Sequence, residues 1–246
     1  MQFTVCRSLR IRPFLPPGLE DMEPTEHVIA EMFDRISGRY DLLNHVLSGY
    51  TDVRWRKKAI RQGLQRGAKN VLDVSTGTGD MAIGYKKHDS RIHVFGLDIS
   101  MEMLKIAKAK AGAGVDLVRG SGLSLPFKDA TFDLVSCAFG IRNIYPRKQG
   151  LHEFFRILRP GGQVTILEFS MPHGLFGRLY RLYFDRVLPQ LGDLLSGTEA
   201  YTYFTASVEA FPAQEDFIHL LAAEGFRDIE AIPLTHGIVT VYSGKK

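Results

Sequence analysis

The chain has 246 residues, of which 45% are apolar and 24% charged, with a formal net charge of +4 at pH 7. This length and composition suit one well-cored α/β domain and do not require two. No apolar run approaches the roughly 20 residues of a membrane-spanning helix, so an integral membrane protein is excluded. Two cysteines cannot form a disulfide framework, which indicates a reducing, cytoplasmic setting. The modest positive charge permits contact with an anionic surface, and we expect no nucleic-acid partner.

Residues 1–21 contain three arginines, three prolines and no long apolar core of the kind found in secretory signals. We therefore expect a disordered extension, with the folded protein starting at Met22. A helix is expected to begin near Pro24, because proline is tolerated in the first turn. One face of that helix carries Val28, Met32, Ile36 and Tyr40 at four-residue spacing.

The central motif is a strand, Val71–Val74, that leads into the turn Ser75-Thr76-Gly77-Thr78-Gly79 and then into a helix ending near Lys87. Small residues let the backbone amides at the helix N-terminus approach a ligand closely. Asp73 would repel a pyrophosphate but not an ammonium or sulfonium group, which favours S-adenosylmethionine (SAM) over NAD. The spacing Gly77-x-Gly79-x-x-Ala82 also satisfies the dinucleotide fingerprint, and a purely structural turn stays open as well.

Further strands alternate with helices along the chain. The strand His93–Leu97 ends at Asp98, in reach of a ribose, which supports a nucleoside ligand of either kind. Ser100 can cap the helix that follows. The remaining predicted elements of this part are the helix Met101–Ala111, the strands Val115–Arg119, Phe132–Phe139 and Val164–Phe169, and a helix with Leu151, Phe154, Phe155 and Leu158 that is closed by Arg159-Pro160-Gly161-Gly162. This alternation predicts a doubly wound parallel sheet.

The C-terminal third departs from this alternation. Leu175–Leu191 is predicted as a helix with a broad apolar face, which suits core packing, a cover over an apolar substrate or contact with a bilayer. A loop is expected at Tyr201, Tyr203, Ser207, Phe211 and Pro212, before a helix Glu215–Glu224 and an antiparallel hairpin of Ile229–Leu234 and Gly237–Tyr242 joined by Thr235-His236. The histidines outside the hairpin turn look solitary, and no Cys or His set has metal-ligand spacing, so we expect no metal.

Several motifs occur in one order along the chain. They are Met32 to Asn44 with Trp55-Arg56, the turn from Asp73 to Asp80, Gly96 to Ser100, Leu125-Pro126-Phe127, Phe139-Gly140-Ile141-Arg142-Asn143, Arg159 to Gly162, Leu167-Glu168-Phe169-Ser170-Met171-Pro172, Ser207 with Phe211-Pro212, and Thr235 to Val239. This set resembles the ubiquinone/menaquinone-biosynthesis C-methyltransferase family from about Val28 to Lys246. The motifs at residues 139–143 and 167–172 are far more specific than the glycine turn.

The resemblance implies a class I SAM-methyltransferase fold, which is α/β and Rossmann-like. Its sheet has seven mostly parallel strands, helices on both faces and a C-terminal antiparallel hairpin. It also implies a single domain over residues 22–246, with 22–66 as an N-terminal helical lid and 172–212 as an insertion that covers the substrate. The implied activity is SAM-dependent methylation of a ring carbon of a polyprenylated quinol. An NAD oxidoreductase and a non-catalytic methyltransferase-like binding or assembly subunit are the alternatives.

By position in the family, Gly77 and Thr78 would line the SAM site, together with Asp73 and Gly79 of the same turn, and Asp98 would hold the ribose. Ser121 and Gly122 would flank the adenine. This pair departs from the family, where Asp-Ala or Asn-Ala is usual. A serine hydroxyl can contact the adenine amine, but without the charge-assisted strength of a carboxylate.

For catalysis, the resemblance and the chemistry of quinol methylation favour Arg142 and Asn143 as the groups that stabilise the quinol oxyanion. His236, Tyr203 and a water ordered by Arg142 are candidates for the base. The alternative for Arg142 is an ion pair with Asp34 or Asp41 that only pins the N-terminal segment. A membrane-dissolved substrate further implies peripheral membrane contact through residues 175–191, and a homodimer is compatible with the sequence.

Overall fold

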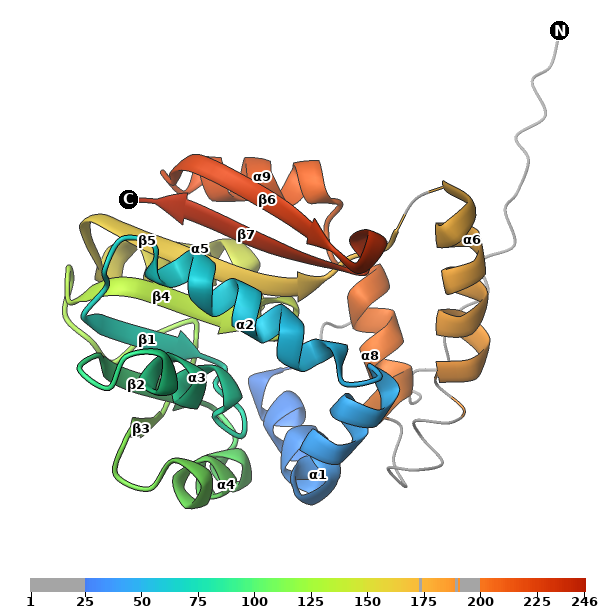
Figure 1. Cartoon of the computed structure of the whole chain (residues 1–246), viewed down its shortest axis with the longest axis horizontal. Coiled ribbons are helices and arrows are strands. Elements are labelled where there is room, and N and C mark those ends of the chain that lie inside the picture. The colour runs from blue at the N-terminus through green and yellow to red at the C-terminus, as the bar shows by residue number, and fades with distance from the viewer. Residues whose placement is uncertain (1–24, 173, 189, 191–199) are drawn as a thin grey trace, which may run out of the picture.

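The computed structural model describes residues 25–172, 174–188, 190 and 200–246, and its centre is one twisted sheet with helices on both faces (Figure 1). The expected N-terminal extension, residues 1–21, lies outside the described residues. So do the end of the predicted helix Leu175–Leu191 and part of the insertion at 172–212.

The sheet has seven strands in the order β3-β2-β1-β4-β5-β7-β6. Their bounds are β1 Asn70–Val74, β2 His93–Asp98, β3 Asp116–Arg119, β4 Phe132–Ala138, β5 Leu158–Phe169, β6 Arg227–Leu234 and β7 Val239–Lys245. All pairings up to β5 are parallel, and β7 lies antiparallel to both β5 and β6. The predicted fold class is confirmed, and strand order reverses between β1 and β4, where ligands bind in such sheets.

Eight helices are described around this sheet: α1 Glu26–Leu47, α2 Thr51–Leu64, α3 Asp80–His88, α4 Met101–Ala111, α5 Arg147–Ile157, α6 Gly174–Leu182, α8 Ala200–Glu209 and α9 Gln214–Ala223. The side chain of Ser100 caps α4 as predicted, by accepting from the Met103 amide at 3.1 Å. Helices α1, α6 and α8 lie beyond the carboxyl ends of the parallel strands (Figure 1). They are therefore placed to enclose whatever the strand ends bind.

The two faces of the sheet have separate apolar cores, because successive strand residues point to opposite sides. Leu72 and Val74 of β1 pack with α5 and α9 on one face, whereas Val71 packs with α2 and α3 on the other. Cys137 is fully buried in the first core, as expected of a structural thiol. Burial on both faces is what fixes the register of β1 and β4, and hence the position of the residues that follow them.

Two local predictions are wrong. The segment predicted as a loop around Tyr203 and Ser207 is helix α8, because Thr205, Ser207 and Val208 are buried and no Gly or Pro interrupts residues 200–209. The segment Arg159–Gly162 ends α5 but also belongs to β5, which starts at Leu158. The Gly161 amide donates to the Lys246 carbonyl at 3.0 Å, so this segment is held to the residue that follows β7.

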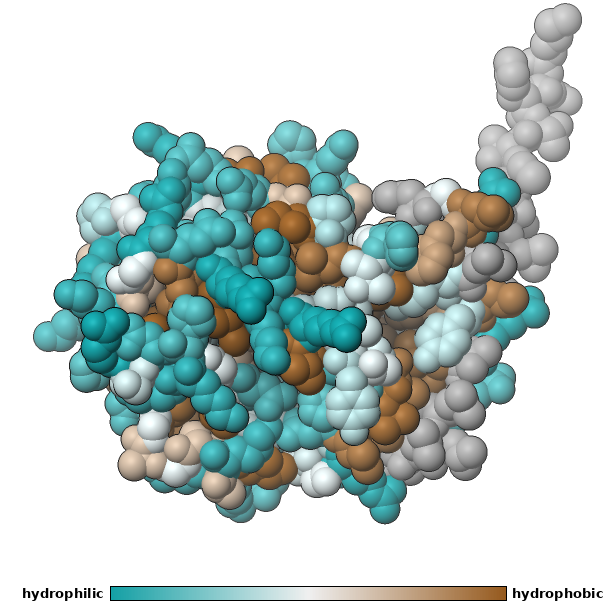
Figure 2. Space-filling view, viewed as in Figure 1, coloured by the Kyte–Doolittle hydropathy of each residue, from teal (hydrophilic) through white to brown (hydrophobic). Residues whose placement is uncertain are grey.

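Helix α6 continues into a π-helical turn, Tyr183–Val187. Phe184 and Leu188 are buried against Val208, whereas Phe176 is 41% exposed and Tyr183 36%. The predicted apolar face therefore packs only in part, and hydrophobic residues also gather on the surface at the side where α6 lies (Figure 2). Among the described helices, none combines the length and apolar character needed to cross a bilayer.

Phe217 of α9 tests how strongly the outer helices stabilise the sheet. Its ring is fully buried, 4.8 Å from that of Tyr242 on β7 and 4.9 Å from that of Phe211. Phe217→Ala leaves a cavity there, so chemical denaturation should show a loss of about 3–5 kcal/mol. The exposed His219→Ala on the same helix should change the unfolding free energy by less than about 0.5 kcal/mol. Equal effects of the two variants would contradict this packing.

Candidate cofactor and substrate site

The turn after β1 is held from behind by Asp73. Its side chain is 1% exposed, and its carboxylate accepts hydrogen bonds from Thr76 Oγ1 and Ser136 Oγ, both at 2.7 Å. Burial raises the pKa of Asp73 to about 6, against the effect of the two hydroxyls. Asp73 does not line the pocket above the turn. It ties the turn to β4 through Ser136. The expectation from the sequence, that the charge of Asp73 acts on the ligand, stays a prediction.

Gly77 and Asp98 line a pocket at the ends of β1 and β2. The Gly77 amide donates to Asp98 Oδ2 at 2.7 Å, and the Ser100 amide donates to Oδ1 at 2.9 Å. Gly77 has φ +56°, and a Cβ built on it would meet no heavy atom within 4 Å. Asp98 is 8% exposed, and burial raises its pKa. A carboxylate beside an open glycine turn suits the hydroxyls of a ribose, and we call this space the nucleoside pocket.

Helix α1 crosses this pocket and carries three carboxylates on one face, at residues 26, 34 and 41. Each accepts a hydrogen bond from a hydroxyl that follows a strand. Ser121 after β3 donates to Glu26, Ser100 after β2 to Asp34, and Thr78 after β1 to Asp41 at 2.6 Å. Thr78 and Ser121 thus face α1, whereas Gly122 lines the pocket. Gly79, with φ +87°, starts α3 and packs against Ala107 of α4.

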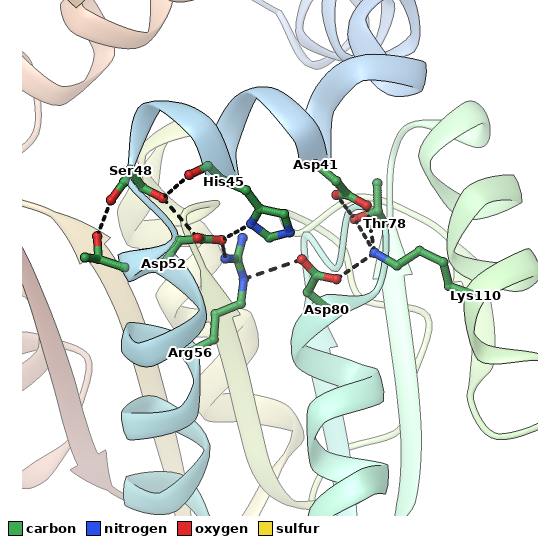
Figure 3. Close-up of polar contacts among 9 residues, drawn as sticks. Asp41, His45, Ser48, Asp52, Arg56, Thr78, Asp80 and Lys110 are labelled. Atoms are coloured by element: carbon green, nitrogen blue, oxygen red, sulfur yellow. Dashed lines mark hydrogen bonds and ion pairs between the residues drawn. The ribbon is translucent and has the colours of Figure 1, made fainter.

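A polar network joins α1 and α2 to the sheet domain (Figure 3). Lys110 of α4 lies 2.8 Å from Asp41 and 2.6 Å from Asp80 of α3. Burial opposes the charge on Lys110, but its bonds to both carboxylates outweigh burial and raise its pKa. On α2, the buried Asp52 binds Arg56 and accepts from His45 Nδ1 at 2.9 Å. His45 is therefore not solitary, contrary to the sequence-based prediction.

A second cavity, of about 390 Å³, lies next to the first pocket. Its walls come from α1, α2, α6 with its π-helical turn, α8, the end of β5 and the residues after β4 and β6. They are mostly aromatic and aliphatic. They include Met32, Ile36, Leu47, Trp55, Phe169, Tyr180 and Phe204. Phe33, Tyr40 and Phe139 line both spaces, so the two meet at these three side chains.

The junction depends on a close approach of the residues after β1 and β4. Ser75 and Phe139 both have left-handed backbone, with φ +54° and +58°, a conformation that costs non-glycine residues energy and often marks a functional site. Both line the nucleoside pocket. A Cβ on Gly140 would lie 2.4 Å from Ser75 Cβ, so only glycine fits between them.

The acidic partner of Arg142 is Glu168, and not Asp34 or Asp41 as considered from the sequence. Its Nη1 lies 2.9 Å from Oε1 of Glu168, the penultimate residue of β5, and also donates to the Phe139 carbonyl, while Nε donates to Ser207 Oγ at 3.2 Å. The alternative pairing with Asp34 or Asp41 is wrong, because both bind hydroxyls elsewhere. Arg142 also lines the large cavity. The remaining guanidinium nitrogen, Nη2, makes no hydrogen bond to the described residues.

Asn143, which lines the first pocket, is joined to Tyr203, which lines the large cavity, as Tyr203 Oη donates to Asn143 Oδ1 at 3.0 Å. Burial raises the pKa of Tyr203, which makes its phenolate a scarce base near pH 7. His236 is exposed at the hairpin turn, with its ring 5.0 Å from that of Phe176, and it does not line the cavity. Of the candidate catalytic residues, the structure therefore groups Arg142, Asn143 and Tyr203 and leaves His236 outside.

Sequence reasoning missed Glu168 and the acidic face of α1. A signal for Glu168 was present, because it lies near the carboxyl end of β5, one residue past Leu167, which pairs with Ala138 at the end of β4. The acidic face also had a signal in the spacing of eight and seven residues between positions 26, 34 and 41, which repeats on one side of a helix. The hydroxyls that donate to these three carboxylates follow three different strands, so the pairings could not be inferred from the sequence pattern.

Residues 21–246 match the model of the ubiE/COQ5 methyltransferase family. A demethylmenaquinone methyltransferase from Deinococcus radiodurans is 44% identical over 235 residues, covering 94% of this chain and 97% of that protein. A ubiquinone/menaquinone biosynthesis C-methyltransferase UbiE from Syntrophotalea carbinolica is 46% identical over 217 residues, 87% of this chain and 92% of that protein. A solved SAM-dependent methyltransferase from Thermotoga maritima has the same fold, with a TM-score of 0.64 at 20% identity over 89% of this chain and 99% of that one.

The raised pKa of Asp73 predicts a pH dependence of stability. Because its pKa is about 6 when folded and near 3.8 when unfolded, the folded state holds this proton more tightly. The free energy of unfolding should therefore fall as pH rises from about 4 to about 6, by roughly 3 kcal/mol for this one group. Asp73→Asn should lack that decline in denaturation curves measured across this range.

Asp133 serves as a control, because its pKa is shifted in the opposite direction. Burial opposes its charge, but hydrogen bonds from the Asn70 and Lys69 amides, with Arg159 nearby, lower its pKa overall. Its contribution to stability should be present at neutral pH and lost as pH falls, so Asp133→Asn should destabilise the protein most at neutral pH. An unchanged pH profile in Asp73→Asn would contradict the assignment for Asp73.

Proposed function

The chain belongs to the ubiE/COQ5 methyltransferase family and is a SAM-dependent C-methyltransferase, and from this premise we propose that its substrate is a polyprenylated quinol, methylated on a ring carbon. The names of the relatives support a demethylmenaquinol or a ubiquinone precursor. The observation that carries the proposal is the large aromatic cavity, which meets the nucleoside pocket at Phe139 and has Arg142 in its wall.

The residues around the first pocket fit SAM. Asp98 offers a carboxylate for the ribose, the open turn at Gly77 leaves room for the ligand backbone, and Leu97, Ile99 and Ile144 give apolar walls. The cavity left beneath α1 is about 60 Å³, whereas ligand pockets usually enclose about 300–1,000 Å³. The N-terminal helical segment, residues 22–66, is therefore proposed to act as a lid that moves outward to admit the cofactor.

The chain's own residues must align two reactants and exclude water, which are the main demands of a displacement at a methyl carbon. When bound, SAM supplies an electrophilic methyl group on a positively charged sulfur. Phe33, Tyr40 and Phe139 line both spaces and would hold the quinol ring against the methyl donor. The insertion at 172–212 contributes Tyr180 and Tyr203 to the cavity and is proposed to cover the ring.

A ring carbon becomes nucleophilic when the neighbouring quinol hydroxyl loses its proton. Arg142 Nη2 would stabilise the resulting oxyanion, because its guanidinium is fixed by Glu168, Ser207 and the Phe139 carbonyl and needs little reorganisation. Asn143 would orient the same oxygen, with its own amide held by Tyr203. The ion pair with Glu168 reduces the net charge of the site, so a neutral quinol can enter it.

Arg142 variants test this role. Arg142→Ala removes the donor and Arg142→Lys loses the planar fork, so turnover should fall by about 100-fold or more with Ala while SAM affinity measured by calorimetry barely changes. Because Arg142→Ala leaves Glu168 buried without its partner, the pair Arg142→Met/Glu168→Met serves as a folded control. A raised quinol KM with unchanged turnover in these variants would assign Arg142 a structural role instead.

The ring type is tested directly by assaying transfer of a labelled methyl group to demethylmenaquinol and to the methoxy-polyprenyl-benzoquinol, each with the same tail. Methylation of one or both on carbon supports the proposal. Tight SAM binding without transfer to either ring would contradict it and favour a non-catalytic binding subunit.

A membrane-dissolved quinol also implies contact with the bilayer surface. Leu175, Phe176 and Leu182 of α6 are exposed beside Arg178 and Arg181, a combination that suits an anionic lipid surface. Vesicle flotation should show binding to anionic vesicles that weakens with salt, and Leu175→Ser/Leu182→Ser should reduce it. Activity on tailed quinols without vesicle binding at low salt would contradict this contact. The homodimer stays a prediction.

A further inference from the structure

The residues after β3 have an unusual hydrogen-bond arrangement. Ser121 Oγ donates its single proton to Glu26 Oε1 on α1 and accepts from the Leu123 amide at 2.9 Å. A serine hydroxyl has one donor and two acceptor positions, so Ser121 has no proton left for a ligand and only one free acceptor position. The strand end itself therefore offers little for recognition of a nucleoside base.

Glu26 offers the strong hydrogen-bond acceptor that Ser121 lacks. It lines the nucleoside pocket and is only partly exposed. Its single hydrogen bond to the described residues engages Oε1, so Oε2 keeps its full capacity to accept. A carboxylate oxygen is a stronger acceptor than a hydroxyl, because its hydrogen bonds are charge-assisted.

The surroundings of Glu26 suit a flat aromatic base. Ile29, Ile99 and Ile144 line the same pocket and are apolar. Gly122 also lines it, and a Cβ on this residue would lie 2.6 Å from Ile144 Cδ1. Ile144 thus occupies the volume that an alanine methyl would fill, which brings an additional apolar side chain to the pocket wall.

We propose that Glu26 recognises the exocyclic amino group of the cofactor's adenine, from helix α1 and not from the end of β3. This inference rests on the proposed use of SAM. An amino group donates to the carboxylate, whereas a 6-oxo purine would place a second acceptor against it, so the site should reject the oxo base. Because Glu26 belongs to α1, the same contact would favour closure of the lid on the correct base.

The test uses calorimetric titration of the purified full chain with S-adenosylhomocysteine and with its 6-oxo analogue, S-inosylhomocysteine. Wild type should bind the adenine compound about 10- to 100-fold more tightly, since a hydrogen bond to a charged group is lost and a repulsion gained with the analogue. Glu26→Ala should weaken binding of the adenine compound by at least about 10-fold. Glu26→Gln should reduce the ratio of the two affinities, because the glutamine amide can donate to the oxo group of the analogue.

Two further variants separate recognition from a general effect on α1. Glu26→Ala/Ser121→Asp returns a carboxylate to the pocket from the strand side and should restore adenine preference. Glu31→Gln lies on the same helix, where Glu31 is exposed and pairs with His27, and should behave as wild type. Wild-type affinity and preference in both Glu26 variants would overturn the role of Glu26 alone. Failure of the wild type to bind either compound would overturn the SAM assignment together with it.

Discussion

The structure depends on the way α1 is held across the ends of three parallel strands. Carboxylates at positions 26, 34 and 41 accept from hydroxyls that follow β3, β2 and β1. None of these bonds lies within α1 itself, so the helix is positioned by the sheet and not by its own sequence alone. Each bond is modest, of the order of 1.5–3 kcal/mol for a hydrogen bond to a charged group. Together they are compatible with a helix that is ordered and yet able to move.

This position of α1 creates both spaces at once. Its inner face closes the nucleoside pocket, and Phe33 and Tyr40 on the same helix form the wall shared with the large cavity. Arg142, which follows β4, forms an ion pair with Glu168 that neutralises its charge. The two spaces are thereby linked through one element, because a shift of α1 would change the shape of both.

Much of the fold was predictable, because strands buried on both faces leave strong apolar runs and glycine turns mark their ends. Helix α8 was missed, since its aromatic and β-branched residues have weak helix propensity and fold as a helix through burial. At the site, residues at or just after strand ends were candidates, as such ends build ligand sites. Gly77, Asp98, Gly122 and Asn143 line the first pocket and Arg142 the large cavity, and their contacts with ligands stay predictions. Asp73, Thr78, Gly79 and Ser121 were also assigned to the ligand, and in the structure each contacts the scaffold around the pocket, which the pattern did not reveal.

The close approach of Ser75 and Gly140 has a consequence for how such a sequence can diverge. With a substituent on residue 140 only 2.4 Å from Ser75 Cβ, the two strand ends do not tolerate independent change. A side chain at residue 140 requires that residue 75 first lose its own Cβ, as in Ser75→Gly. We therefore expect substitutions at these two positions to be epistatic. A library that varies both positions jointly would recover functional pairs whose single substitutions are inactive on their own.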